Sequence, residues 1–240
     1  MAWSQEFRRD EYSFIQHPQN KHLDVGYQGL LSRARNARGK RQMMKKGVGG
    51  EDEWIKHRVD AYLTVEKKFL RKGMGGVHVE YGQPARGPEI GSIKVSNSIY
   101  SARNMYVING RLCILTMYDK ARKRRGNTEY IIRFLPDELS QIFVQYIVHV
   151  RPFARALDHR ESEYLFGDAR GPWAGEELSR ELKAITGKHL GVELTVSSWR
   201  QVAVGIAECH LIRASKSWEK EEEDEEDGDQ FAEGDDKEEL

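Results

Sequence analysis

Three basic side chains stand at positions where a phosphate group would need them. Arg86 lies in the Gly- and Pro-rich segment 82–90, Lys120 follows the apolar run 112–118, and Arg200 lies near the start of an amphipathic segment. A guanidinium presents a planar fork of donors that can hold two phosphate oxygens at once. Attack on a phosphodiester builds negative charge on its non-bridging oxygens, which two arginines would stabilise, while a mobile lysine would protonate the leaving oxygen as general acid. The three residues therefore predict a phosphodiester site that needs no metal.

Each of these residues also has a plainer interpretation. Arg86 alone would be an ordinary loop arginine. Lys120 would be one more solvated base in a basic loop, where Lys123 is a rival. Arg200 would form a structural ion pair with a carboxylate such as Glu193. Their order along the chain, with a turn, a hairpin and a helix start, favours the phosphate site.

The charge of the chain is divided between a basic body and an acidic tail. The sequence has 240 residues with 38 basic and 38 acidic side chains. Residues 219–240 hold 14 acidic and 2 basic side chains, which leaves 36 basic and 24 acidic ones in residues 1–218, a net charge of +12. A basic body favours a polyanion as partner. With only 39% apolar and 32% charged residues, we expect one sizeable domain with appendages that are not core.

Several classes of protein are disfavoured by the composition. Cys113 and Cys209 cannot form a disulfide framework, and we expect both to be buried thiols of a reducing compartment. No run approaches the ~18 apolar residues that span a bilayer, and residues 1–10 lack the apolar core of a signal peptide. The eight histidines form no compact cluster with cysteines or carboxylates. We expect a soluble intracellular protein with no membrane contact, no metal and no small-molecule cofactor.

The middle of the chain carries the clearest secondary structure. Strands are predicted over 105–108 and 111–118, and Asn109-Gly110 between them is a strong hairpin signal. A third strand follows over 129–134, after a basic loop at 119–128. The sequence therefore predicts a three-stranded antiparallel meander with a basic tip.

Helical periodicity surrounds this meander. Helices are expected over 52–71 (ended by Gly73–Gly76), from Pro136 and Asp137 onward (ended or kinked at Pro152), over 175–186 (ended by Gly187) and over 197–212, with a modest helix around 23–31 and a glycine linker at 47–50. The fold class is therefore α+β, mainly α-helical, with a small three-stranded antiparallel sheet.

Two basic stretches are candidates for contact with phosphates. Residues 33–46 contain seven basic side chains and no acidic one, and the loop at 119–128 is similarly basic. The predicted DNA-binding residues are Arg38, Lys40, Arg41, Arg122, Lys123, Arg124 and Arg125. The first stretch has a plain alternative as a solvated linker, and it also fits a phosphate-gripping arm or a nuclear localisation signal.

The order of these elements resembles the catalytic domain of the tyrosine recombinases. More narrowly, the chain is similar to fungal proteins of the Crypton transposon type, and to the recombinase-like segment upstream of fungal telomere-linked RecQ-type helicases. Four stretches within about residues 12–213 carry the resemblance: 14–20, 82–90, 118–120 with 133–136, and 190–197. It implies a nuclear protein that binds duplex DNA in recombination and integration.

The resemblance also implies roles for individual residues. It makes Arg86, Lys120 and Arg200 the catalytic triad of basic residues, with Glu89 and Gln201 in support. The family has a histidine three positions before its second arginine, where this chain has Ser197. The implied division is a basic N-terminal arm and linker over 1–50, an incomplete recombinase-like domain over 51–213 and an acidic tail over 214–240.

The nucleophile of this family is a tyrosine placed after the second arginine. Here the last tyrosine is Tyr164, and only Trp218 offers an aromatic side chain near the family's other position. We therefore expect a DNA-binding protein derived from a tyrosine recombinase that does not cleave DNA by itself. Two alternatives stay open. One is an active enzyme whose tyrosine comes from a missing segment or a partner subunit, including a second copy, and the other is a non-enzymatic module for chromatin or protein contacts.

The acidic tail has three interpretations. An acidic run of this kind is usually disordered and solubilising. It would also compete with DNA for the basic body, which would make binding autoinhibited and sensitive to salt. A histone-binding role is the third.

Overall fold

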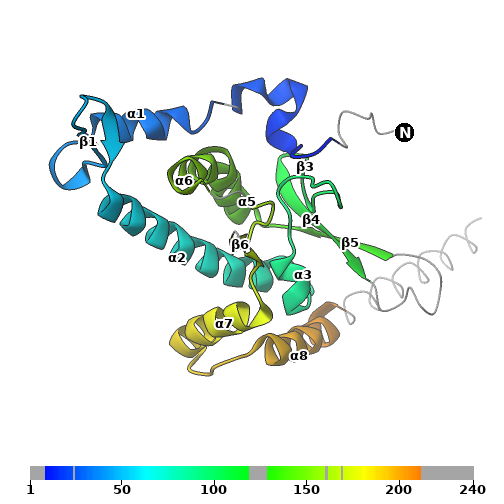
Figure 1. The fold of residues 1–240 in the computed structure, drawn as a ribbon. Coiled ribbons are helices and arrows are strands. Elements are labelled where there is room, and N and C mark those ends of the chain that lie inside the picture. Colours follow the sequence, from blue (N-terminus) through cyan, green and yellow to red (C-terminus); the bar gives the residue numbers. More distant parts are fainter. Residues whose placement is uncertain (1–8, 24, 119–128, 160–161, 169, 212–240) are drawn as a thin grey trace, which may run out of the picture. The chain divides into compact units, whose positions relative to one another are not determined.

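The computed structural model describes residues 9–23, 25–118, 129–159, 162–168 and 170–211. The chain divides into two compact units, residues 1–196 and residues 197–240. Helices dominate the first unit, and short antiparallel sheets lie among them (Figure 1). This is the mixed α+β, mainly helical class that the sequence predicts.

The helices have the following bounds. They are α1 (Gln28–Asn36), α2 (Lys56–Glu80), α3 (Gly87–Gly91), α5 (Asp137–Gln145), α6 (Arg151–Asp158), α7 (Gly175–Leu190) and α8 (Val196–Ile206). Short 3-10 turns occupy Phe14–Gln16, Pro18–Leu23 and Gly39–Arg41, and π turns occupy Tyr146–Val150 and Ala207–Leu211.

Helix α2 does not end at its glycines, so the predicted end near Arg71 is wrong. A methyl group on Gly73 would lie 2.8 Å from the ring of Phe143, and one on Gly75 would lie 2.9 Å from Ile185. These glycines are therefore points of close approach to α5 and α7. The packing offsets the ~1 kcal/mol that a glycine costs within a helix.

Two other predicted helix ends also need correction. Helix α7 continues through Gly187 and ends at Gly191, whose φ of 71° is left-handed, as is common for a terminating glycine. The chain also stays helical past Pro152. This proline lies in the first turn of α6, and the π turn Tyr146–Val150 directly precedes that helix.

The central sheet has the strand order β3–β4–β5, with the bounds that the sequence predicts. Its strands are β3 (Met105–Ile108), β4 (Arg111–Tyr118) and β5 (Glu129–Phe134), all antiparallel. Asn109 and Gly110 both have positive φ in the hairpin turn. Leu112, Cys113 and Ile114 of the central strand β4 are all buried, whereas Ile132 of β5 is exposed.

The segment expected to be a glycine linker is the turn of a hairpin. Strand β1 (Met44–Lys46) pairs with β2 (Asp52–Trp54), and the Gly47 N–H donates to the Glu51 carbonyl over 2.8 Å. The two strands also form ion pairs across the hairpin, one of them between Lys46 and Asp52 at 2.9 Å. The remaining described strands, β6 (Gly167–Asp168) and β7 (Gly171–Pro172), form a further short hairpin.

The N-terminal arm contributes more core than its sequence predicts. Tyr12 and Phe14 are buried. Ala34 of α1 belongs to a buried cluster whose other members come from α2 and α6, namely Val59, Phe153 and Leu157. This arm is therefore part of the packed first unit.

Of the two cysteines, Cys113 is buried as expected, but Cys209 is exposed. The expectation of two buried thiols is thus wrong for Cys209, which lies in the π turn after α8. Among the described residues, no helix combines the length and apolarity that crossing a bilayer requires.

Candidate phosphate-binding site

Arg86 lies at the end of a tight turn that follows α2. The turn passes through Gly82, whose φ of 94° is left-handed. The Ala85 N–H donates to Tyr81 Oη over 2.9 Å, and the Tyr81 side chain is buried. Arg86 then caps the N-terminus of α3 with an extended backbone. A buried tyrosine thus fixes the backbone from which the arginine projects.

Glu89 contacts Arg86 in two places. Its Oε2 accepts the Arg86 N–H over 3.3 Å, and its Oε1 lies 3.8 Å from Arg86 Nε. The Arg86 side chain keeps 42% of its surface exposed. A guanidinium has five N–H donors, so one carboxylate at this distance does not exhaust them. Glu89 therefore orients the arginine while its guanidinium still meets solvent.

Arg133, which the sequence analysis did not assign to the site, connects the sheet to this turn. It lies on β5 and is only 8% exposed. Its Nε donates to the Gln83 carbonyl over 2.9 Å and its Nη1 to Thr116 Oγ1 over 2.5 Å. Its guanidinium also lies 5.1 Å from the centre of the Tyr81 ring. The one available signal was an arginine at an inward-facing position of an otherwise apolar strand.

A second support comes from the start of α7. A methyl group on Gly87 would lie 3.0 Å from Gly175 Cα, and one on Gly91 would lie 2.3 Å from the Trp173 carbonyl oxygen. The short helix α3 is therefore pressed against the chain that enters α7, at a distance that only glycine permits. Sheet and helix together hold the turn that carries Arg86.

The structure places only part of the predicted site. Lys120 and the basic residues of its loop, Arg122, Lys123, Arg124 and Arg125, lie outside the described residues. Lys120 follows Thr116 by four residues in the sequence, and Thr116 is the residue that Arg133 bonds. The strand that leads into the basic loop is thus connected through Arg133 to the turn before Arg86.

Arg200 lies on α8, in the second unit. Its side chain is exposed, as are those of Ser197 and Gln201. The three positions have i, i+3 and i+4 spacing, so they share one face of the helix. Arg86 and Arg200 thus belong to different units of the chain.

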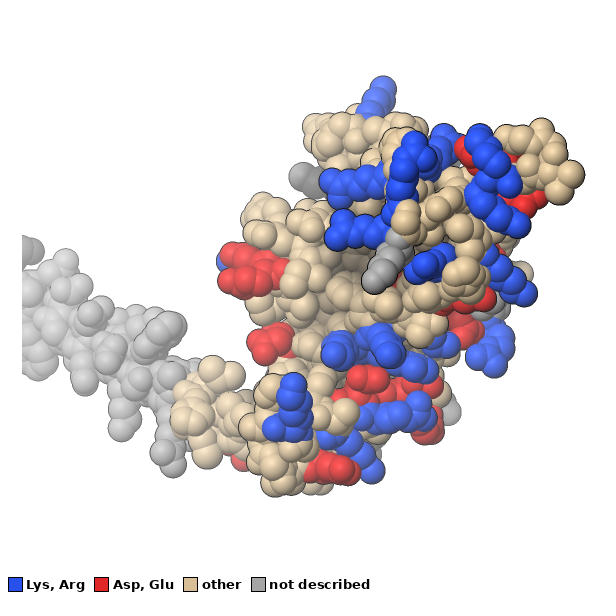
Figure 2. All heavy atoms as spheres, turned by 90° about the vertical axis from the view of Figure 1, so that its left-hand side faces the viewer, with Lys and Arg blue, Asp and Glu red and all other residues tan. Residues whose placement is uncertain are grey.

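The N-terminal basic stretch is partly neutralised by its own hairpin. Lys45 and Lys46 pair with Glu53 and Asp52, and the hydrogen bond and charge of Lys46 lower the pKa of Asp52. Arg38 precedes the 3-10 turn before this hairpin and Arg41 is its last residue; both are exposed, while the side chain of Lys40 lies outside the description. Figure 2 shows Lys and Arg side chains gathered on the face that includes α1 and β1, with acidic side chains between some of them.

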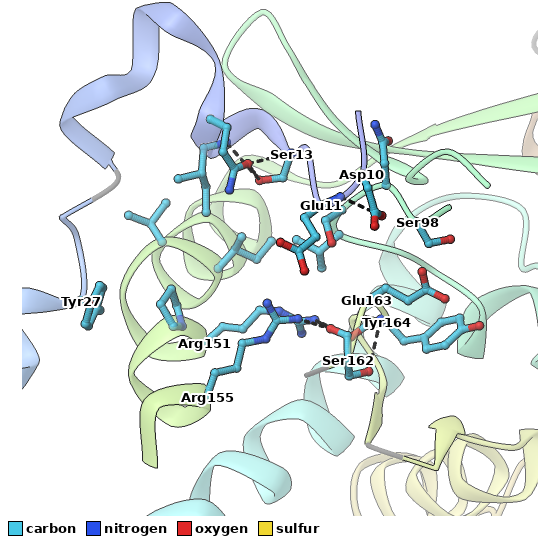
Figure 3. A pocket seen from close by; sticks show the side chains of 18 of the residues that line it. Asp10, Glu11, Ser13, Tyr27, Ser98, Arg151, Arg155, Ser162, Glu163 and Tyr164 are labelled. Carbon is cyan, nitrogen blue, oxygen red and sulfur yellow. Dashed lines mark hydrogen bonds between the residues drawn. The ribbon is translucent and has the colours of Figure 1, made fainter. Parts of the chain in front are cut away.

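A large cavity in the described part of the chain lies elsewhere. It has a volume of about 700 Å³, and of the described phosphate-site residues neither Arg86 nor Arg200 lines it. Asp10 and Glu11 project into it from one wall, and Arg151 and Arg155 from the opposite wall (Figure 3). Both arginines donate to the Ser162 carbonyl. These guanidinium groups therefore bind the chain's own backbone and hold the segment around Ser162 against α6.

A buried polar network adjoins this cavity. Burial lowers the pKa of Arg151 to about 10, and the neighbouring Arg155 acts in the same direction, so Arg151 remains a cation at neutral pH. Burial raises the pKa of Glu66, although its Oε1 accepts a 2.5 Å hydrogen bond from Tyr146 Oη. Burial and the Glu66 charge raise the pKa of Tyr146 as well. These shifts follow from packing between α2 and the helices after β5, away from the Arg86 turn.

The described residues contain no group of three or more His, Cys, Asp or Glu side chains that could hold a metal ion. No protein-family model matches the sequence. No solved structure matches it either. The recombinase resemblance therefore remains a hypothesis that rests on the residues themselves.

Proposed function

We propose that this chain binds duplex DNA through its backbone phosphates, and that Arg86, Lys120 and Arg200 form a phosphate site of the tyrosine recombinase type. The observation that carries the proposal is the support of Arg86. A half-exposed arginine is held by Tyr81, Glu89 and the α3–α7 contact, and its turn is bonded to the buried Arg133 of the sheet. A solvated loop arginine would need no such support.

The charge of the body supports a nucleic acid as the partner. Residues 1–218 carry a net charge of +12, and duplex DNA carries one negative charge per about 1.7 Å of its axis. Contacts to phosphates give affinity and position without reading a sequence. We therefore expect binding that depends steeply on salt and weakly on the sequence of the duplex.

A salt series on a labelled duplex tests the proposal. The full chain is compared with an Arg86→Ala/Arg200→Ala double variant and with Arg111→Ala. Arg111 is the control because it is exposed and lies at the β3–β4 turn, the end of β4 away from Thr116 and Tyr118. The double variant should lose at least tenfold in affinity, since each phosphate contact is worth on the order of 1 kcal/mol or more. Equal losses in the double variant and in Arg111→Ala would reject the site and leave only a basic surface.

The proposal concerns binding, and strand cleavage is a separate question. Cleavage by this type of site needs a phenol as nucleophile, and no tyrosine follows Arg200 in the sequence. Incubation with a nicked duplex that traps the cleaved product would show whether a covalent protein–DNA adduct forms. An adduct would support the alternative of an active enzyme that takes its nucleophile from another chain.

A further inference from the structure

The side chains that β5 places on the outer face of the central sheet are apolar and partly exposed. Tyr130, Ile132 and Phe134 alternate along β5 and are 61%, 54% and 47% exposed. Ile108 of β3 is on the same face and is 42% exposed. Scattered single apolar residues are normal on a protein surface, but a contiguous patch of this kind marks an interaction site.

Strand β5 is also an edge strand of the sheet, because the order is β3–β4–β5. Its hydrogen-bonding direction can be worked out. The Leu135 N–H donates to the Leu112 carbonyl of β4, so odd-numbered residues of β5 direct their backbone groups toward β4. The N–H and C=O groups of Tyr130, Ile132 and Phe134 therefore point away from β4, toward the open edge.

Backbone and side chains of β5 thus present one self-complementary pattern. The three residues with outward backbone groups are the same three with exposed apolar side chains. If a second copy pairs its β5 antiparallel about a two-fold axis at Ile132, each Ile132 faces its counterpart. Tyr130 of each copy then faces Phe134 of the other. If the axis moved by one residue in either direction, only two of these three residues in each copy would face one another.

The edge lacks the usual protection against such pairing. Native sheets block exposed edges with lysines, prolines or bulges, and the register of β4 with β5 has no bulge over Cys113–Tyr118. The outward face of β5 carries no charged residue.

We propose that β5 forms an interface between two copies of this chain, which joins their central sheets into one six-stranded antiparallel sheet. Edge-to-edge pairing brings only the flanks of Tyr130, Ile132 and Phe134 into contact, and the outer face of these side chains stays exposed, so the pairing buries much less than their exposed surface. Stable dimers bury about 800 Å² per partner. The dimer is therefore a weak one that forms by mass action at high protein concentration or on a shared ligand.

Cysteine cross-linking of the full chain tests the register directly. In a Cys209→Ser background, Ile132→Cys would face its own copy with Cα atoms about 5.5 Å apart, within the disulfide range of about 4.4–6.8 Å. Ile131→Cys is the matched control, because it is the adjacent isoleucine and points to the other face. Mild oxidation should give a covalent dimer for Ile132→Cys and at least tenfold less for Ile131→Cys.

Sedimentation of the uncross-linked chain completes the test. The weight-average mass should rise with concentration, and Ile132→Lys should abolish the rise, while Ile99→Lys, at a loop isoleucine that is 80% exposed, should not. Thermal melting of each variant shows whether the fold is intact. A chain that stays monomeric at all concentrations overturns the proposal, as does a dimer that Ile132→Cys fails to cross-link. A dimer that survives Ile132→Lys also overturns it, because its interface lies elsewhere.

Discussion

Replacing Arg133 with methionine should both destabilise the first unit and weaken DNA binding. Methionine retains much of the aliphatic length but leaves the Gln83 carbonyl and the Thr116 hydroxyl without their charged donor. Two hydrogen bonds from a charged group contribute about 1.5–3 kcal/mol each, and the contact with the Tyr81 ring about 0.5–1 kcal/mol. Removal of a buried guanidinium recovers part of this. The net expectation is a loss of about 2 kcal/mol.

The assay is thermal unfolding, followed by duplex binding below the transition. A loss of about 2 kcal/mol corresponds to a fall in Tm of about 4–8 °C for a protein of this size. Arg111→Met is the control, because it loses an exposed ion pair to Asp137 that contributes about 0.5 kcal/mol or less. The reasoning is refuted if Arg133→Met melts within 1 °C of Arg111→Met.

Binding by the same variants tests whether Arg133 acts through Arg86. If the sheet holds the turn for the arginine, Arg133→Met and Arg86→Ala should each weaken binding. The double variant should then be no weaker than Arg86→Ala alone, because coupled positions are not additive. Full additivity of the two losses would show that Arg133 acts on DNA affinity by a separate route.

Three further predictions concern packing, pH and the tail. Gly91→Ala places a methyl group 2.3 Å from the Trp173 carbonyl and should cost at least ~2 kcal/mol in a thermal melt, whereas Gly76→Ala, which meets nothing within 4 Å, should stabilise by about 0.5–1 kcal/mol. The folded-state pKa of Glu66 lies above its unfolded value because the side chain is buried, so the stability that Glu66 contributes falls as pH rises from about 4.5 through the raised pKa. In a series of Tm measurements against pH, Glu66→Gln should not show this fall and should melt at a higher temperature than the parent chain at neutral pH. Deletion of residues 219–240 removes a net charge of −12 and should tighten duplex binding several-fold at low salt and little at high salt, and equal affinities throughout would exclude competition by the tail.

The sheet could be predicted from the sequence because its signals are local. Alternating apolar residues and the Asn109-Gly110 turn determine the strands, and each strand has its predicted bounds. The helix ends could not be predicted, because glycines such as Gly73 and Gly75 either end a helix or lie within it, depending on which side chains pack against them. Here that is Phe143 and Ile185, about 70 and 110 residues away in the chain.

The same distinction applies to the candidate site. Arg86 stands out locally, because Pro84 and Pro88 flank it and the carboxylate of Glu89 follows three residues later. The part played by Arg133 does not stand out, since its acceptors Gln83 and Thr116 are 50 and 17 residues away. The arginine in the strand is a local signal, but the strand does not indicate which acceptors it meets, because folding alone brings these groups together.

The central claim, a phosphate contact at Arg86, is tested most directly by the slope of log K against log salt for duplex binding. Each phosphate neutralised by a cation contributes about −0.9 to this slope. The account predicts that Arg86→Ala makes the slope shallower by about 0.9 and lowers affinity by a similar factor on unrelated duplex sequences, while Arg111→Ala leaves the slope unchanged. An Arg86→Ala variant with the slope and affinity of the parent chain would contradict it.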